Sequence, residues 1–230
     1  MIIDVLSDSL KYSVSNSKNF FKLFILNLLD FLIIPIFFTE GYKYRIVEES
    51  INGMMYSGDE LPEFDDFKKL FIDGCKLIIL KILTIIPVIA VLIILDTFLN
   101  LEPYLIYISY VLIFILALYI CVAIPNMIKY DSLAKAFDFK ELIKILKGIG
   151  FSLIIPIIIT FPVFLRVIDI LEKDIVNFLF NGIHLTNFII FSDSLSAIII
   201  SIINTLLIDT FLIIVGYRIM GILYIDVGED

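Results

Sequence analysis

Polar side chains inside long apolar runs are the residues of this sequence that could do chemistry. Asp30 lies near the middle of the run at residues 20–38, and Asp209 lies inside a run near the carboxyl end. The complete set of candidate polar residues is Asn27, Asp30, Lys81, Asn204, Thr205 and Asp209. A charge at the centre of a bilayer costs at least about 2.5–3.5 kcal/mol, so such side chains usually face the interior of a helix bundle and pair.

These polar residues have two interpretations. They could line an ion or proton path or a polar ligand site, or they could form a structural cluster that joins helices, with Lys81 paired to one of the aspartates. The motifs of hydrolases, metalloproteases and nucleotide-binding loops are absent from the sequence, and His184 is the single histidine. We therefore expect no catalytic residues, no metal site and no cofactor, and we expect that the protein is not an enzyme.

The composition indicates an integral membrane protein. Of the 230 residues, 60% are hydrophobic, and the mean hydropathy is +1.05. A soluble domain is about 45–50% apolar, and a molecule of this size cannot hide the excess from water. The net charge is −8, and the 17 basic residues form no concentrated patch, so a nucleic-acid partner is not expected. The length fits one membrane domain over residues 1–230.

Five apolar runs are long enough to cross a bilayer, which takes about 20 residues in a helix. They are residues 20–38, 77–95, 104–128, 149–168 and 195–223. Unpaired backbone groups are costly in lipid, so continuous apolar runs must be helices. The sequence predicts an all-α membrane bundle of five transmembrane helices. Residues 175–191 are apolar but broken by polar residues, and a sixth crossing there is the alternative to an interfacial helix.

The distribution of Lys and Arg predicts the orientation. Basic residues are frequent after the first and third runs and sparse after the second and fourth, as the rule of positive cytoplasmic loops requires. The C-terminus is then cytoplasmic. Five crossings would place the N-terminus outside the cell. If Pro35 instead breaks the first run into a hairpin, the N-terminus returns to the cytoplasmic side.

Two short segments before the second and fourth runs have the pattern of amphipathic interfacial helices. Pro62 and the acidic residues after it suit the first turn of a helix over residues 62–75. Residues 137–147 read similarly, with apolar side chains on one side. Each segment is interpreted as a surface elbow that sets the entry angle of a span, or as a site where a partner docks.

The stretch from Gly41 to Leu80 resembles an archaeal family of membrane proteins known as domain of unknown function 4013. Similar stretches are "SDSLKYSVSNSKNFFKLFIL" near the start, "AFDFKEL" at 136–142 and "GYRIMGILY" near the end. The most specific part of the resemblance is the interfacial motif Leu61, Pro62, Glu63, Phe64, Asp65, Asp66 and Phe67. The family often has Trp where this chain has Phe67. The resemblance implies a multi-pass protein of the cell membrane and no assigned activity, so no site is carried over.

The expected function is therefore that of a non-enzymatic membrane scaffold or subunit. The alternative is a small transporter or channel that uses the intramembrane carboxylates. A membrane enzyme would need a convergent polar pocket, which the sequence alone does not assemble. The expected partners are the lipid bilayer and either other membrane proteins or a second copy of the chain.

Overall fold

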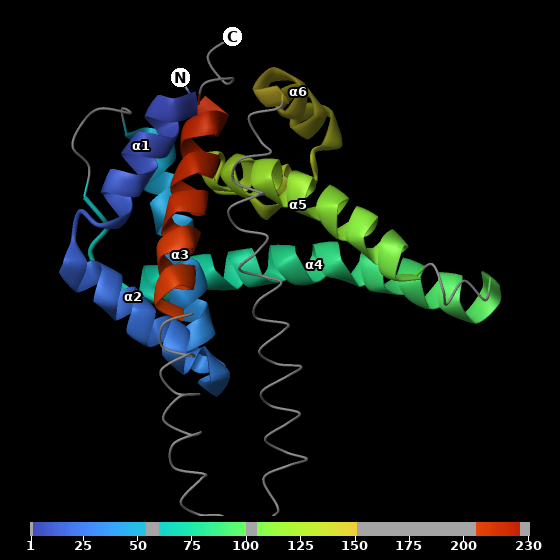
Figure 1. Cartoon of the computed structure of the whole chain (residues 1–230), viewed down its shortest axis with the longest axis horizontal. Coiled ribbons are helices and arrows are strands. Elements are labelled where there is room, and N and C mark those ends of the chain that lie inside the picture. Colours follow the sequence, from blue (N-terminus) through green and yellow to red (C-terminus); the bar gives the residue numbers. More distant parts are fainter. Residues whose placement is uncertain (1, 54–59, 100–104, 151–205, 226–230) are drawn as a thin grey trace, which may run out of the picture.

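The computed structural model describes residues 2–53, 60–99, 105–150 and 206–225. This part of the chain is helical and contains no strand, which confirms the all-α prediction for the residues described (Figure 1). Three of its helices are long and apolar enough to cross a membrane, namely Phe67–Leu95, Tyr107–Lys129 and Leu206–Ile225.

The chain begins with two helices, α1 (Ile2–Ser13) and α2 (Ser17–Leu29). The side chain of Asn16 accepts a hydrogen bond from the backbone N–H of Asn19 and so caps the start of α2. α2 ends in the 3₁₀ turn η1 (Asp30–Leu32), and the 19-residue helix α3 (Ile34–Asn52) follows.

The prediction of one continuous span over residues 20–38 is wrong. Ile33, between η1 and α3, has a φ of 68°, a left-handed conformation that ends a right-handed helix. Pro35 follows in the first turn of α3, where its missing N–H leaves no hydrogen bond unmade. α2 and α3 therefore form a hairpin, which corresponds to the alternative in which Pro35 breaks the first run.

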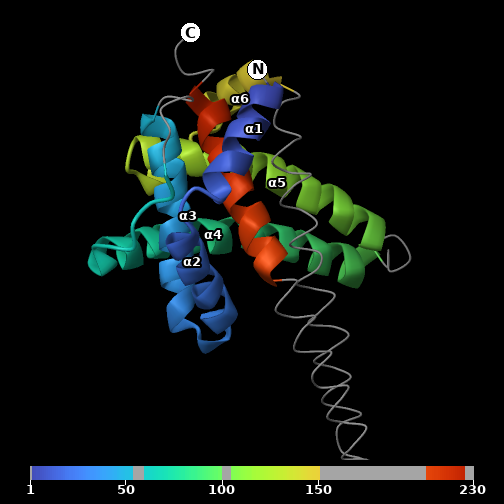
Figure 2. The ribbon, with the colours of Figure 1, turned by 60° about the vertical axis from the view of Figure 1, so that its left-hand side comes forward.

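The hairpin brings the first and last helices of the described chain to the same end of the bundle. Figures 1 and 2 show α1 beside the upper turns of the C-terminal helix, Leu206–Ile225. Arg218 of that helix contacts Asp8 of α1, with 3.2 Å between Nε and Oδ2. The two ends of the described chain therefore lie at the same end of the bundle, as in the alternative in which Pro35 breaks the first run. The count of five crossings stays a prediction.

Among the described residues the longest helices are α4 (Phe67–Leu99) and α5 (Leu105–Lys129). α4 contains the whole predicted span at 77–95, and α5 covers the predicted span at 104–128 from residue 105 on. Both continue through an internal proline, at Pro87 and Pro125. Apolar side chains that point away from the protein, such as Ile86 (54% exposed), form the surface of α4 beyond its first turns. Such a face suits contact with lipid.

One further predicted segment is wrong, and three lie wholly or partly outside the described residues. α4 begins only at Phe67 and runs on without a break, so a separate interfacial helix over 62–75 is wrong. The predicted span at 149–168, apart from its first two residues, and the ambiguous segment at 175–191 lie outside the described residues. The predicted span at 195–223 is described from residue 206 on.

α3 is the central helix, and α4 lies across it (Figures 1 and 2). A methyl group on Gly41 of α3 would collide with the backbone of Leu70, and one on Gly74 of α4 would collide with the backbone of Phe37. On another side of α3, a methyl group on Gly221 of the C-terminal helix would collide with Ser50. Glycine at these positions allows the backbones to touch.

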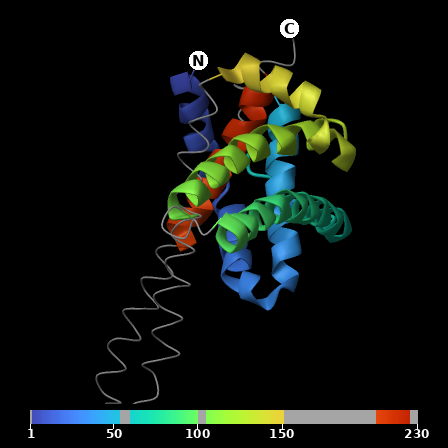
Figure 3. The same cartoon turned by 90° about the vertical axis from the view of Figure 1, so that its right-hand side faces the viewer.

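A short return segment closes the described core at the end of α5. The 3₁₀ helix η3 (Leu133–Phe137) packs back on α5, and α6 (Phe139–Ile149) follows it (Figure 3). The carboxylate of Asp138 accepts a hydrogen bond from the backbone N–H of Glu141 and caps α6. α6 occupies most of the predicted helix at 137–147.

Candidate functional site: a charged cluster at the α3–α4 crossing

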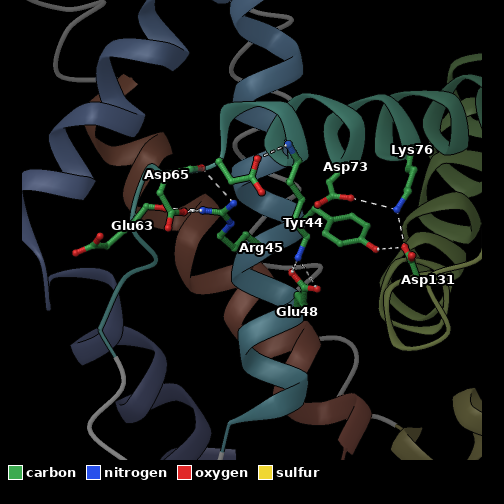
Figure 4. Close-up of polar contacts among 10 residues, drawn as sticks. Tyr44, Arg45, Glu48, Glu63, Asp65, Asp73, Lys76 and Asp131 are labelled. Atoms are coloured by element: carbon green, nitrogen blue, oxygen red, sulfur yellow. Dashed lines mark hydrogen bonds and ion pairs between the residues drawn. The ribbon is translucent and has the colours of Figure 1, made fainter.

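Residues 60–66, here called the strap, run along α3 before α4 begins. Arg45 of α3 binds the strap at several points, as Figure 4 shows. Its guanidinium donates to the carbonyl oxygen of Glu63 at 2.7 Å, to the carbonyl oxygen of Asp65 at 3.3 Å and to the carboxylate of Asp65. A planar guanidinium can satisfy several acceptors in fixed directions, so Arg45 sets the course of the strap.

The apolar part of the strap is also held by α3. The ring of Phe64 stacks on Tyr42 with 4.0 Å between centroids and 4° between planes. The buried hydroxyl of Tyr42 donates to the carbonyl oxygen of Pro62 at 2.8 Å. Leu61 is 2% exposed, and Asn19 donates to its carbonyl oxygen. The strap is therefore part of the packed structure.

The end of the strap starts α4. Asp66 has a φ of 40°, and its carboxylate accepts a hydrogen bond from the backbone N–H of Lys69 at 3.1 Å. This is the geometry of a helix N-cap. The prediction that Pro62 opens the helix is wrong, because α4 begins at Phe67, and the carbonyl oxygens of Pro62 and Glu63 accept hydrogen bonds from Tyr42 and Arg45. Residues 61–66 of the interfacial motif therefore belong to the strap, Asp66 caps α4, and Phe67 is the first residue of that helix.

Ion pairs continue from the strap along the first turns of α4 (Figure 4). Lys69 lies 3.1 Å from Glu48 of α3. Lys76 contacts Asp73 on its own helix at 3.1 Å and Asp131, in the turn after α5, at 2.5 Å. The hydrogen bond from Lys76 lowers the pKa of Asp131 from its usual value. The cluster thus connects α3, α4 and the end of α5.

These side chains surround an open hollow of about 390 Å³. Its lining consists of Tyr44, Glu48, Asp66, Lys68, Lys69, Ile72, Asp73, Lys76 and Asp131. Burial of the Tyr44 ring raises the pKa of its hydroxyl, which donates a 3.2 Å hydrogen bond to Asp131. Both carboxylates and lysines line the hollow, so it presents both signs of charge to a ligand.

The six polar residues singled out in the sequence are distributed over several contacts. Asn27 donates to Thr210 of the C-terminal helix at 2.9 Å, and Asp30 accepts from Thr39 at 2.8 Å. Lys81 pairs with Glu40 of α3 and not with an aspartate. Asp209, 4% exposed, lies next to the Asn27 partner, and Asn204 and Thr205 lie outside the described residues.

Comparison with known proteins places the chain in a family. Residues 28–225 match the model of a protein family described as "Protein of unknown function (DUF4013)". The chain belongs to the DUF4013 family. The resemblance inferred from the sequence is confirmed, and the matched range contains the whole strap. Among curated proteins and among solved structures, none matches the chain.

Two charged residues within the DUF4013 match were missed by sequence reasoning. Glu40, 7% exposed, binds both Lys43 at 2.8 Å and Lys81, and so joins α3 to α4. Arg218, 2% exposed, contacts Asp8, the hydroxyl of Ser50 at 3.4 Å and the ring of Tyr12 at 4.3 Å. Only the spacing of Glu40 and Lys43, three positions apart on one helix, was readable in the sequence.

Proposed function

We propose that this DUF4013 protein is a non-enzymatic scaffold or subunit of the cell membrane, with several crossings and a cytoplasmic C-terminus. The observation that carries the proposal is that polar side chains of the protein connect one structural element to another. Glu40, Lys81 and Arg45 bond one structural element to another in the described part of the chain. Such bonds hold helices in place and so support a structural role.

The open hollow of the charged cluster is the proposed docking place for a partner protein. It lies at the first turns of α4, before the apolar part of that helix. Lys68 and Ile72 both line the hollow, where Lys68 is exposed and Ile72 has 46% of its surface exposed. A surface that combines charges of both signs with an apolar side chain favours specific recognition of a protein segment.

Site-specific photo-cross-linking tests this proposal in the native membrane. A photoreactive amino acid at position 72 should give one discrete protein adduct, and Lys68→Glu should weaken it. The matched control is position 86 on the same helix, which faces away from the protein and should give only lipid adducts. Monomeric protein without an adduct at position 72 would contradict the proposal.

The transporter or channel alternative is weaker on the described geometry. Asp30 is bonded to Thr39, and Glu40 is bonded to two lysines, so both carboxylates hold helices together. Vesicles that contain the protein should therefore have the same proton permeability as empty vesicles. A proton flux that Asp209→Asn abolishes, with the fold intact, would support transport and count against the scaffold.

A further inference from the structure

α6 is held close to the end of a candidate span. Tyr107–Lys129 of α5 is long and apolar enough to cross a membrane, and residues 130–138 alone separate it from α6. The intervening segment is tied back to α5, because Asn126 donates to the carbonyl oxygen of Lys135 at 2.8 Å and Tyr119 to that of Ala136 at 2.7 Å. With α5 across the bilayer, α6 lies at its surface.

The apolar arc of α6 is wider than the protein covers. Leu142, Ile145 and Ile149 are buried against the rest of the chain. Phe139 and Ile143, four positions apart, continue the same arc and remain 60% and 51% exposed. At about 100° per residue they lie within roughly 40° of each other and form one exposed apolar strip along the helix.

A row of lysines borders this strip. Lys140, Lys144 and Lys147 are exposed and spaced by four and three positions, so they share one side of the helix. The nearby acids have another partner, because Lys135 binds Asp138 at 3.2 Å and Glu141 at 2.7 Å. Within the described ranges, no hydrogen bond or ion pair engages the three lysines, so their positive charge is uncompensated there.

We propose that the outer face of α6 binds anionic phospholipid headgroups at the membrane surface. Phe139 and Ile143 enter the boundary between headgroups and acyl chains, while the three lysines bind headgroup phosphates. An apolar strip bordered by lysines, on a helix next to the end of a candidate span, matches both parts of an anionic lipid surface. The surface attraction of three lysines strengthens docking by about a hundredfold.

The experiment follows the environment of residue 143 in the full-length protein. Ile143→Cys, in a background with Cys75→Ser and Cys121→Ala, is labelled with an environment-sensitive fluorophore. The labelled protein is reconstituted into vesicles of phosphatidylcholine alone or with increasing phosphatidylglycerol. We expect a blue shift of the emission that grows with the anionic lipid and declines at high salt, since salt screens surface charges.

Two sets of variants separate the contributions. Lys140→Gln, Lys144→Gln and Lys147→Gln together should abolish the response to phosphatidylglycerol. Lys11→Gln and Lys18→Gln together remove charge from exposed lysines of the first two helices, outside the hollow, and should preserve it. Phe139→Ser should weaken the blue shift in both kinds of vesicle, because it removes apolar surface and not charge.

The outcomes that would overturn the proposal are equally specific. Equal emission with and without phosphatidylglycerol would exclude recognition of anionic lipid. A blue shift that survives loss of the three lysines but is lost with the control lysines would place the lipid contact elsewhere. If the triple lysine variant fails to fold, Lys140→Gln, Lys144→Gln and Lys147→Gln made singly should each weaken the response, and three single variants that all respond like the original chain would overturn the proposal.

Discussion

Gly41 of α3 and Gly74 of α4 lie against each other where the two helices cross. A β-carbon on Gly74 would stand 3.0 Å from the backbone nitrogen of Gly41 and would collide with the carbonyl group of Phe37. A β-carbon on Gly41 would collide with the carbonyl group of Leu70. The obstacle is backbone in both directions, and it cannot rotate aside as a side chain would.

Gly41→Ala or Gly74→Ala should therefore lower stability by about 1–3 kcal/mol, as overpacking of a tight contact does. The measurement is the midpoint of thermal unfolding in detergent, read from loss of the monodisperse peak in size-exclusion chromatography. Gly148→Ala, on the exposed side of α6, is the control and should leave the midpoint unchanged or raise it. Equal midpoints for all three variants would mean that the crossing is looser than described.

Arg218→Leu should cost about 3 kcal/mol, near the low end for a broken buried ion pair, because Asp8 keeps 24% of its side chain exposed. The loss also removes the contact with Tyr12. A double-mutant cycle with Asp8→Ala checks the pairing. The double variant should lose less stability than the sum of the two single variants, and strict additivity would show that the two side chains do not interact.

Arg45→Gln should release the strap without unfolding the helices. The variant loses the charged donor that binds both Glu63 and Asp65, so the strap should open about ten times more often or more. Limited digestion with a glutamate-specific protease, followed at Glu63, measures the opening. Lys69→Gln removes a partly exposed ion pair with Glu48 and should digest at the original rate.

The connection between α4 and the turn after α5 should weaken in acid. The pKa of Asp131 is lowered mainly by the hydrogen bond from Lys76, so the folded state favours its charged form. The stabilisation is present above the unfolded value of about 3.8 and is lost as the pH falls through the folded pKa. Thermal midpoints measured from pH 6 to pH 3 should decline less for Asp131→Asn than for the original chain. Parallel declines would contradict this role.

The positions of the long helices could be predicted from the sequence because apolar length decides them. The runs at 77–95 and 104–128 correspond to α4 and α5, and a separate amphipathic helix follows α5. The break at Ile33 is harder to predict, since the run around it is as apolar as the other runs. A proline at position 35 fits both a kinked span and the first turn of a new helix, and tertiary packing selects the second.

The polar contacts could be predicted less well, because two residues that meet only in the folded structure show no regular spacing in the sequence. One of the two interpretations of the polar residues paired Lys81 with an aspartate, whereas its partner in the structure is Glu40, where α3 crosses α4. The motif around Pro62 has the composition of a helix start, and side chains of α3 instead bind its carbonyl groups. Asp8 and Arg218 contact each other across 210 positions of sequence.

The long sequence separation between Asp8 and Arg218 affects the protein while it is being translated. α1 leaves the ribosome before the arginine that it contacts is made, because Asp8 and Arg218 are 210 positions apart. Translation at about 5–20 residues per second leaves α1 without this partner for at least about ten seconds. During that time the surface of α1 that carries Asp8 and Tyr12 lacks its contact with Arg218, which forms only when the helix Leu206–Ile225 arrives. A chain that stops short of Arg218 keeps that surface, and a membrane protease or chaperone could use it to recognise unfinished protein.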